Sequence, residues 1–311
     1  MEWEKLGRIL NISEESEQMY SHTMTPVPIH LEGDIYRVIF NSRTKDNISK
    51  AFSADINIKT LEVVTLNKEP ILELGDFGAF DEKGIVVSSV VEKDDKLHIY
   101  YLGFPRIAKE LFAASIGVAL SEDKGLSAKK LFKGPIKGIS KNEPYFSTGP
   151  RVLFDKGIYK MWYASCLGWK MEEGKLKHYY HIKCCESANG IDWGEGKVAI
   201  DFKNDLEYAM SVPSIIKDGK DDYKMWYSYR AQENIDAYRI GYATSKDGDN
   251  WTRRDEEMEG FESASGWDSE MVLASFVFDH DQDRYMLYNG NEYGKTGLGL
   301  AKLKKPNRKA R

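Results

Sequence analysis

Acidic residues recur at matching places in the sequence, each six or seven residues ahead of a short apolar segment that is predicted to be a strand. The series is Asp81, Glu143, Glu207 and Asp268, with Glu270 close to its last member. Carboxyl groups that meet around one axis can cleave a glycosidic bond, because one protonates the leaving oxygen while another activates water or attacks. We therefore predict that two or three of these acids are catalytic. The alternative is that they are ordinary surface acids in a chain with 49 Asp and Glu residues.

A second set of side chains directly follows the predicted central strands, and their types suit ligand binding. Guanidinium groups match carboxylate or phosphate, aromatic rings offer stacking surfaces for sugars, and amides pair with hydroxyls. The alternative for each arginine is a salt bridge to one of the acids above. The set comprises Arg43, Arg106, Trp169, Arg230, Asn289 and Asn291.

The first repeat of the chain has no acid at the matching place and carries His22 instead. A histidine there can carry a proton or contact a phosphate. The alternative is a histidine that is simply hydrogen-bonded within the structure.

These candidates are positioned by five copies of one strand, which usually ends in an aromatic pair. The copies end 61, 62, 64 and 61 residues apart (101−40, 163−101, 227−163, 288−227), and such a period is typical of a radial or stacked repeat. Further apolar segments and Asn-Gly or Asp-Gly turns surround each copy, as in antiparallel strands joined by tight turns. Each repeat is thus predicted to be a four-stranded propeller blade. The five copies are residues 36–40, 97–101, 159–163, 223–227 and 284–288.

The repeats leave no room for a linker, so we expect one all-β domain over residues 1–311, a five-bladed β-propeller of four-stranded antiparallel blades. The last repeat lacks a fourth strand, and residues 1–10 resemble one without partners. We predict that this closing strand pairs beside residues 299–303, which covers two edges otherwise open to aggregation. Residues 304–311 form a basic tail that we expect to be a solvated end.

Composition narrows the partners and the compartment. A net charge of −5 that is spread along the chain argues against an extended nucleic-acid surface. The sequence has no apolar run of membrane-spanning length and no signal-like start, so neither a membrane partner nor export is expected. Three cysteines, an odd number, make no disulfide framework or metal spacing. We expect a cytoplasmic protein with reduced thiols, and its oligomeric state is left open.

Two segments of the last repeat, together with the blade pattern, resemble a known superfamily. Residues 266–270 read Gly-Trp-Asp-Ser-Glu before the last inner strand, and residues 288–294 read Tyr-Asn-Gly-Asn-Glu-Tyr-Gly after the central one. The pattern resembles the five-bladed propeller glycosidases of glycoside hydrolase families 32, 43, 68 and 130. The resemblance covers nearly the whole chain as architecture. It implies an enzyme, a hydrolase or a phosphorylase, that cleaves or transfers a glycosyl unit of a carbohydrate or sugar-phosphate ligand.

The chain departs from the pattern of those families in its first repeat. They commonly place an Asp there, where this chain has His22, and the Arg-Asp-Pro triplet of the sucrose-cleaving members is absent. The resemblance is closer to the family 130 mannoside phosphorylases, in which phosphate replaces the base. It implies Asp81 as a proton donor and a phosphate held by basic side chains, namely His22, Arg43, Arg151 and Arg230.

Two other classes of function stay open at this point. One is a sugar-binding or scaffold propeller without turnover, which the missing acid of the first repeat favours. The other is a different reaction on a sugar nucleotide. No cofactor is expected, although the acids would tolerate a divalent ion in the central channel and phosphate is a possible co-substrate.

Overall fold

Short antiparallel strands joined by turns make up most of the protein, as the repeats predict. The computed structural model describes residues 1–108, 111–172, 174–231 and 235–305. The basic tail beyond residue 305 lies outside the described residues. In chain order the elements are β1 (Trp3–Leu10), β2 (Ser21–Glu32), β3 (Ile35–Arg43), β4 (Ser49–Asn57), β5 (Val63–Asn67), β6 (Ile85–Lys93), β7 (Lys96–Gly103), β8 (Ser115–Ser121), β9 (Lys129–Lys130), β10 (Ser147–Asp155), β11 (Ile158–Glu172), β12 (Lys175–Ser187), β13 (Lys197–Ile200), β14 (Glu207–Gly219), β15 (Asp222–Ala231), β16 (Ile235–Ser245), β17 (Trp251–Arg253), the 3₁₀ helix η1 (Asp255–Glu257), β18 (Leu273–His280), β19 (Asp283–Asn289), α1 (Asn291–Gly294) and β20 (Leu298–Leu303).

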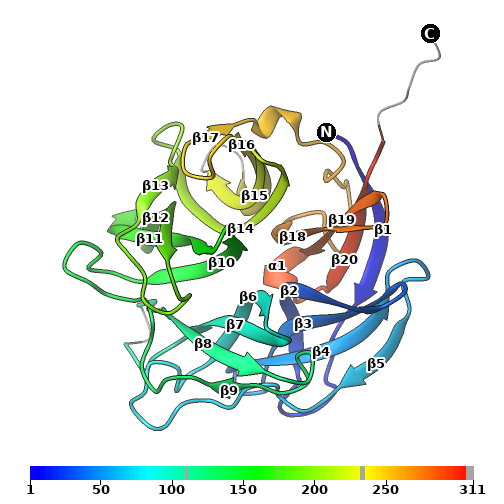
Figure 1. Ribbon diagram of the computed structural model, residues 1–311, viewed down its shortest axis with the longest axis horizontal. Helices are drawn as coiled ribbons and strands as arrows, with labels where there is room; N and C mark the ends of the chain where they lie inside the picture. Colours follow the sequence, from blue (N-terminus) through cyan, green and yellow to red (C-terminus); the bar gives the residue numbers. More distant parts are fainter. Residues whose placement is uncertain (109–110, 173, 232–234, 306–311) are drawn as a thin grey trace.

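The sheets are arranged radially around a central axis, as Figure 1 shows, with β2, β6, β10, β14 and β18 nearest the centre. Three sheets have four antiparallel strands, in the orders β2-β3-β4-β5, β6-β7-β8-β9 and β1-β20-β19-β18. The strands β10 to β17 form one larger sheet, because Tyr180 of β12 makes a single parallel bridge with Ala209 of β14. The prediction of an all-β fold built from four-stranded antiparallel sheets is therefore confirmed.

The first strand of the chain completes the sheet formed by the last three. Trp3 lies opposite Leu303 and Arg8 lies opposite Gly299, so β1 runs antiparallel along β20. This pairing joins the two ends of the described chain by backbone hydrogen bonds and leaves neither strand edge unpaired on that side. The side chain of Trp3 is buried in the core next to Trp226, with the ring centroids 6.0 Å apart.

The aromatic central strands form the core between neighbouring sheets. Trp162, Tyr163, Trp226 and Tyr227 are fully buried. Burying such large side chains supplies most of the stabilisation of the packed sheets, at roughly 25 cal/mol per Å² of apolar surface. These rings are therefore structural and are not a platform for a ligand.

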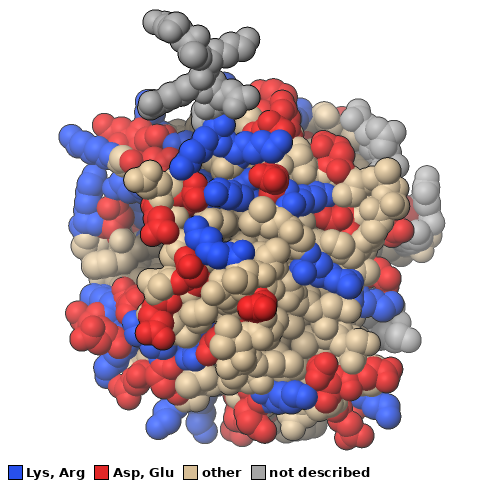
Figure 2. Space-filling model, turned by 90° about the vertical axis from the view of Figure 1, so that its right-hand side faces the viewer, with Lys and Arg blue, Asp and Glu red and all other residues tan. Residues whose placement is uncertain are grey.

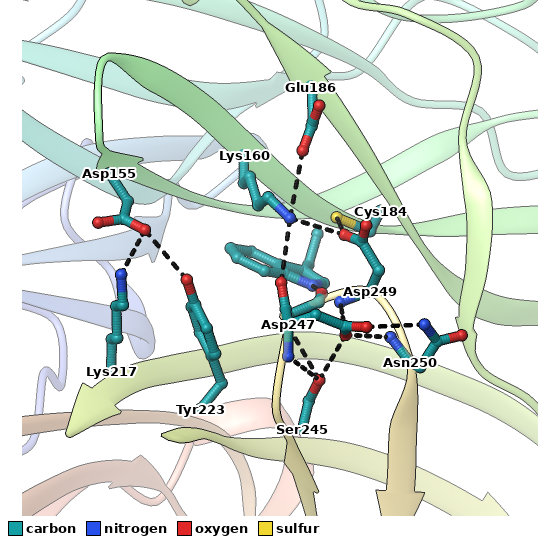
Figure 3. Close-up of polar contacts among 12 residues, drawn as sticks. Asp155, Lys160, Cys184, Glu186, Lys217, Tyr223, Ser245, Asp247, Asp249 and Asn250 are labelled. Atoms are coloured by element: carbon teal, nitrogen blue, oxygen red, sulfur yellow. Dashed lines mark hydrogen bonds and ion pairs between the residues drawn. The ribbon is translucent and has the colours of Figure 1, made fainter. Parts of the chain in front are cut away.

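Tight turns between the third and fourth strands of a repeat contact the central strand of the preceding repeat. In Figure 3, Asp247 accepts hydrogen bonds from the backbone N–H groups of Asp249 and Asn250 and from Ser245, which holds the pKa of Asp247 well below its usual range. The carbonyl of Gly248 in this turn accepts a hydrogen bond from Trp162 Nε1 at 3.0 Å. The turn at residues 245–250 thus contacts β11, the central strand of the preceding repeat.

Each inner strand is irregular at the same place, where it approaches the axis. The pairing register shifts around Thr25, Val87, Gly149, Val212 and Ala274, which lie 62 or 63 residues apart (87−25, 149−87, 212−149, 274−212). All but Val87 have positive φ, between 46° and 57°. A bulge bends its strand and redirects side chains, and bulges are common beside functional sites. In β2, β10, β14 and β18 the bulged part of the strand lines the pocket described below.

Charged side chains of both signs are mixed on one side of the molecule. On the side shown in Figure 2, Lys and Arg alternate with Asp and Glu without a large field of one sign. Among the described residues, no helix is both long and apolar enough to cross a membrane.

Candidate ligand-binding site

A cavity of about 340 Å³ lies where the bulged inner strands meet, and we call it the axial pocket. Each of the five sequence repeats contributes to it, through residues of an inner strand, the end of a central strand or the loop that follows a central strand. Pockets of this size at the mouth of a closed β architecture are typical ligand sites. The lining residues are Met24, Thr25, Arg43, Phe112, Phe146, Thr148, His178, Tyr180, Ser211, Val212, Arg230, Tyr238, Leu273, Ala274, Asn289 and Tyr293.

One wall of the axial pocket is aromatic. The ring of His178 stacks between Phe112, at 5.7 Å and 12°, and Tyr180, at 5.3 Å and 16°. Phe146 packs edge-on against all three rings. Burial, followed by the nearby charge of Arg230, lowers the pKa of His178 to about 4, so its imidazole is neutral at pH 7.

This wall is built by an unusually long hairpin. The strands β11 and β12 have 15 and 13 residues, whereas the corresponding β7 and β8 have 8 and 7. Side chains on one face of a strand alternate, so His178 and Tyr180 point to the same side. Trp169, on the opposite strand, pairs with His178. The centroids of the two rings are 4.8 Å apart, so Trp169 packs against this wall.

The other wall carries positive charge. Burial lowers the pKa of the Arg43 guanidinium, whose Nη1 donates a hydrogen bond to Asn47 Oδ1 at 3.1 Å. No carboxylate within the described ranges forms an ion pair with Arg43. Arg230 lies over the rings of Tyr208 and Tyr238, 5.2 and 5.1 Å from their centroids. A desolvated arginine that lines a cavity, as Arg43 does, favours an anionic ligand.

His22 lies near Arg43 but does not add a charge. It is buried, and its Nδ1 is hydrogen-bonded to Ser21 Oγ at 2.8 Å. Burial, and then the charges of Arg43 and Lys295, lower the pKa of His22 to about 4. At pH 7 it is therefore a neutral hydrogen-bonding group.

The acids predicted to be catalytic occupy other places, and three of them repeat one arrangement, which we call the acid–tyrosine clusters. Each acid accepts a hydrogen bond from a tyrosine 20 residues later and forms an ion pair with a lysine. The oxygen–oxygen distances are 2.9 to 3.1 Å, and the lysine nitrogens lie 2.6 to 3.1 Å away. The clusters are Asp81–Tyr101–Lys130, Glu143–Tyr163–Lys137 and Asp268–Tyr288–Lys5.

Glu207 has a related position with different partners. Both of its carboxylate oxygens accept hydrogen bonds from Arg253, at 2.6 and 2.7 Å. Arg253 also binds Asp255, and Asp255 in turn accepts a hydrogen bond from Tyr227, the residue that matches the tyrosines of the other clusters. Glu270 differs from the four buried acids because its side chain is exposed.

A glycine on the third strand makes room for the tyrosine of the Asp81 cluster. Tyr101 crosses Gly117, where a Cβ atom would come within 2.4 Å of the tyrosine ring. The hydroxyl therefore reaches toward the outermost strand, from which Lys130 approaches Asp81. Arg253 of β17 and Lys5 of β1 also come from outermost strands. As far as the chain is described, the axial pocket has no Asp or Glu in its lining, so the catalytic role of the five acids stays a prediction.

Of the residues predicted to bind a ligand, the structure brings Arg43, Arg230 and Asn289 to the lining of the axial pocket. Asn289 is partly used by the fold, since its Oδ1 accepts the backbone N–H of Thr25 at 2.8 Å. His22 and Trp169 support the walls. Their prediction as substrate-binding residues stays open.

The other three predicted binding residues contact the protein itself. Arg106 is exposed and pairs with Glu82, and Asn291 Oδ1 accepts the backbone N–H groups of Glu270 and Met271. Arg151 is fully buried, with its guanidinium carbon 3.4 Å from the centroid of the Phe276 ring.

Sequence reasoning missed the aromatic wall. Phe112, Phe146, His178 and Tyr180 lie outside the repeated motifs, so the period gave no reason to select them. The available signal was the alternation of His178 and Tyr180 in a strand that extends well beyond the repeat. Tyr238 was missed as well, although it belongs to the third strand of its repeat.

Comparisons with known proteins place the chain among relatives. No family model matches it. Two uncharacterized proteins of Mycobacterium tuberculosis, Rv1502 of strain ATCC 25618 / H37Rv and MT1551 of strain CDC 1551 / Oshkosh, are each 35% identical to it over 306 residues, which cover 97% of this chain and 99% of the relative.

Solved structures show the same architecture at low sequence identity. A structure described as a glycoside hydrolase has a TM-score of 0.72 at 15% identity and covers 99% of this chain and 94% of its own. A thermostable family-43 glycoside hydrolase has a TM-score of 0.68 at 16% identity, with coverage of 96% and 97%. A structure from work on the GH130 family of mannoside phosphorylases has a TM-score of 0.64 at 14% identity, with coverage of 99% and 95%.

These likenesses show that the chain has the propeller fold of those glycoside hydrolases. The closer relationship lies in the sequence, where identity extends over nearly the full length of both chains. The chain belongs to the same protein family as Rv1502 and MT1551 of Mycobacterium tuberculosis.

Proposed function

We propose that this protein is a carbohydrate-active enzyme, a single-domain five-bladed propeller closed by β1, which binds an anionic carbohydrate or a carbohydrate together with phosphate. One observation carries the proposal. The axial pocket combines an aromatic wall with arginine side chains, and its described lining contains no carboxylate.

The arginines support the anionic part of the ligand. Arg43 is desolvated without an ion-pair partner in the described ranges, which costs free energy that a bound anion would recover. Arg230 is held by two tyrosine rings, so its fork is oriented before a ligand arrives. A phosphate or carboxylate between the two would receive charge-assisted hydrogen bonds.

The aromatic wall supports the carbohydrate part. Sugar rings present C–H faces that pack on aromatic rings, and their hydroxyl groups need nearby donors and acceptors. Thr25, Thr148, Ser211 and Tyr293 supply such groups in the lining. Several of the structures with this fold are glycoside hydrolases, which agrees with a sugar ligand.

The charge of the pocket favours phosphate as the attacking group. In a phosphorolysis, an oxygen of hydrogenphosphate forms a bond to the anomeric carbon, the bond to the leaving oxygen breaks, and that oxygen takes up the proton that hydrogenphosphate gives up. Hydrolysis by paired carboxylates would need two acids at the pocket. Asp81, the proton donor that the family resemblance implies, lines a different cavity, so this role is not supported by its position.

A ligand screen followed by a turnover assay tests the proposal. We expect inorganic phosphate and hexose 1-phosphates to raise the melting temperature, because a ligand that binds only the folded state stabilises it. Oligosaccharides should then be cleaved in the presence of phosphate and not in its absence. Stabilisation by neutral sugars only, with phosphate-independent cleavage, would contradict the anionic assignment.

Sugar binding without turnover is a second candidate, favoured by a specific observation. None of the five predicted catalytic acids lies in the axial pocket. Calorimetry that detects a carbohydrate ligand, together with no product after prolonged incubation with or without phosphate, would establish this alternative.

A further inference from the structure

Three side chains that can ligate a metal meet between two neighbouring hairpin turns. Asp34 lies in the turn between β2 and β3, while His280 ends β18 and Asp281 follows it. The Nε2 atom of His280 is 2.8 Å from Asp34 Oδ1 and 3.4 Å from Asp281 Oδ2. One ligand atom from each residue lies within 4.8 Å of the other two.

We propose that Asp34, His280 and Asp281 bind a divalent transition-metal ion, with zinc as the best-suited ion. One imidazole nitrogen and two carboxylate oxygens are a donor set that zinc accepts, with water in the fourth position. The two carboxylates balance the charge of a divalent cation.

The spacing is close to what zinc needs. With bonds of about 2.0–2.1 Å, tetrahedral ligand atoms lie about 3.3–3.4 Å apart. The separation between His280 and Asp281 already has that value, and the one between His280 and Asp34 would lengthen by about 0.5 Å. The side chain of Asp281 is 71% exposed, so ligand movement is unhindered and the ion can enter from solvent.

The other ring nitrogen of His280 also has a hydrogen-bonding partner. The other ring nitrogen of His280, Nδ1, is 3.2 Å from the hydroxyl of Tyr36. Metal-bound histidines usually donate this second N–H to an oxygen, which fixes the tautomer and the ring orientation.

An ion at this position would connect two different sheets. β2 and β3 belong to one sheet, and β18 and β19 belong to the sheet that contains both β1 and β20. A metal ion would cross-link these two sheets at their hairpin ends. Because binding requires the folded arrangement of two distant segments, metal should stabilise the folded state.

The chain also contains a matched control. His181 pairs with Asp201 at 3.3 Å but belongs to no group of three ligands among the described residues. The free cysteines are poor competitors for zinc at pH 7, since all three are buried and burial raises the pKa of Cys166 to about 11 and that of Cys185 to about 12.

Calorimetric titration of the EDTA-treated full-length chain with zinc and cobalt(II) tests the site. We expect one ion per chain, a higher melting temperature with metal, and a cobalt(II) spectrum without a thiolate charge-transfer band. Asp281→Asn and His280→Gln should each weaken binding at least tenfold, whereas His181→Gln should leave it unchanged.

Each result of these measurements either supports the metal site or overturns it. Because Asp281 is exposed, Asp281→Asn should fold even if His280→Gln does not. The proposal is overturned if the unsubstituted chain binds neither metal below millimolar concentration. It is also overturned if Asp281→Asn binds as tightly as the unsubstituted chain, or if the cobalt(II) spectrum shows thiolate ligands.

Discussion

The axial pocket and the acid–tyrosine clusters both contain polar side chains in buried surroundings, but they are built in opposite ways. In the clusters each charge has its partner, as Asp81 has Lys130 and Tyr101, and the same arrangement recurs at a constant spacing. In the pocket, Arg43 has no ion pair within the described chain, and the lining residues of the five groups of strands differ from one another. The charges of the clusters are paired within the fold, whereas Arg43 in the pocket has a neutral hydrogen-bond partner, Asn47.

This difference shows how to tell a structural polar residue from a ligand-binding one in a propeller. The acid–tyrosine clusters recur in three repeats because they meet a need of the fold: each ties the loop before an inner strand to the central strand of the same sheet. A ligand does not share the repeat of the strands, so its site must depart from that repeat. The departures here are the long β11–β12 hairpin and the arginines at the ends of β3 and β15.

The largest expected effect tests whether the buried acids are structural. Glu207→Gln removes the charge that pairs with Arg253 and leaves a buried guanidinium with Asp255 alone. We expect the free energy of unfolding to fall by about 3–4 kcal/mol, since breaking a buried pair is strongly destabilising. Urea denaturation followed by tryptophan fluorescence measures the loss.

Glu270→Gln is the matched control, because it makes the same chemical change at an exposed predicted acid. It should alter the free energy of unfolding by no more than about 0.5 kcal/mol. If Glu207→Gln is as stable as the unsubstituted protein and has lost turnover, Glu207 is catalytic and the contrast between the two regions fails.

The next effect concerns pH and the pocket histidines. The pKa values of His22 and His178 are lowered from 6.5 to about 4, so the unfolded chain binds protons more readily than the folded one. The contribution of the two neutral histidines to stability is fully present above pH 6.5 and is lost as the pH falls toward 4. Each histidine should remove about 2 kcal/mol between pH 6.5 and pH 5.

His178→Phe isolates one of these contributions. Within the described residues, Nδ1 of His178 is buried without a hydrogen-bond partner, so a phenyl ring can take its stacked place. Denaturation midpoints between pH 5 and pH 7 should vary less in this variant. An unchanged pH profile would mean that His178 titrates normally and that the pocket wall is more hydrated than the structure indicates.

A third prediction compares two arginines that the sequence proposed as ligand contacts. Arg43→Gln should weaken binding of an anionic ligand about 10- to 100-fold, the range expected for lost charge-assisted hydrogen bonds. Arg106→Gln should leave affinity unchanged, because Arg106 pairs with Glu82 outside the axial pocket. Calorimetry with phosphate measures both. Equal losses would place the anion elsewhere.

The same contrast explains how far the sequence could be interpreted. The aromatic central strands recur because each sheet needs a packed core, so their period predicts the sheets and the pairing of β1. The acids also recur, and their constant distance of 20 residues to a tyrosine was the sign that they have partners within the fold. His178 and Tyr180 could not be selected by a period, since they lie where the period is broken.

The smallest expected effect concerns Arg151, which belongs to neither region. It is fully buried on Phe276, its Nε has no partner in the described part of the chain, and burial lowers its pKa to about 9. Arg151→Met keeps an unbranched side chain, removes the cost of burying a charge and loses a cation–π contact. These contributions oppose each other, so the free energy of unfolding should change by no more than about 1 kcal/mol. Phosphate affinity should be unchanged. A fall in the free energy of unfolding of more than about 2 kcal/mol would mean that the Arg151 guanidinium has hydrogen-bond partners within the fold, as the acids of the acid–tyrosine clusters do.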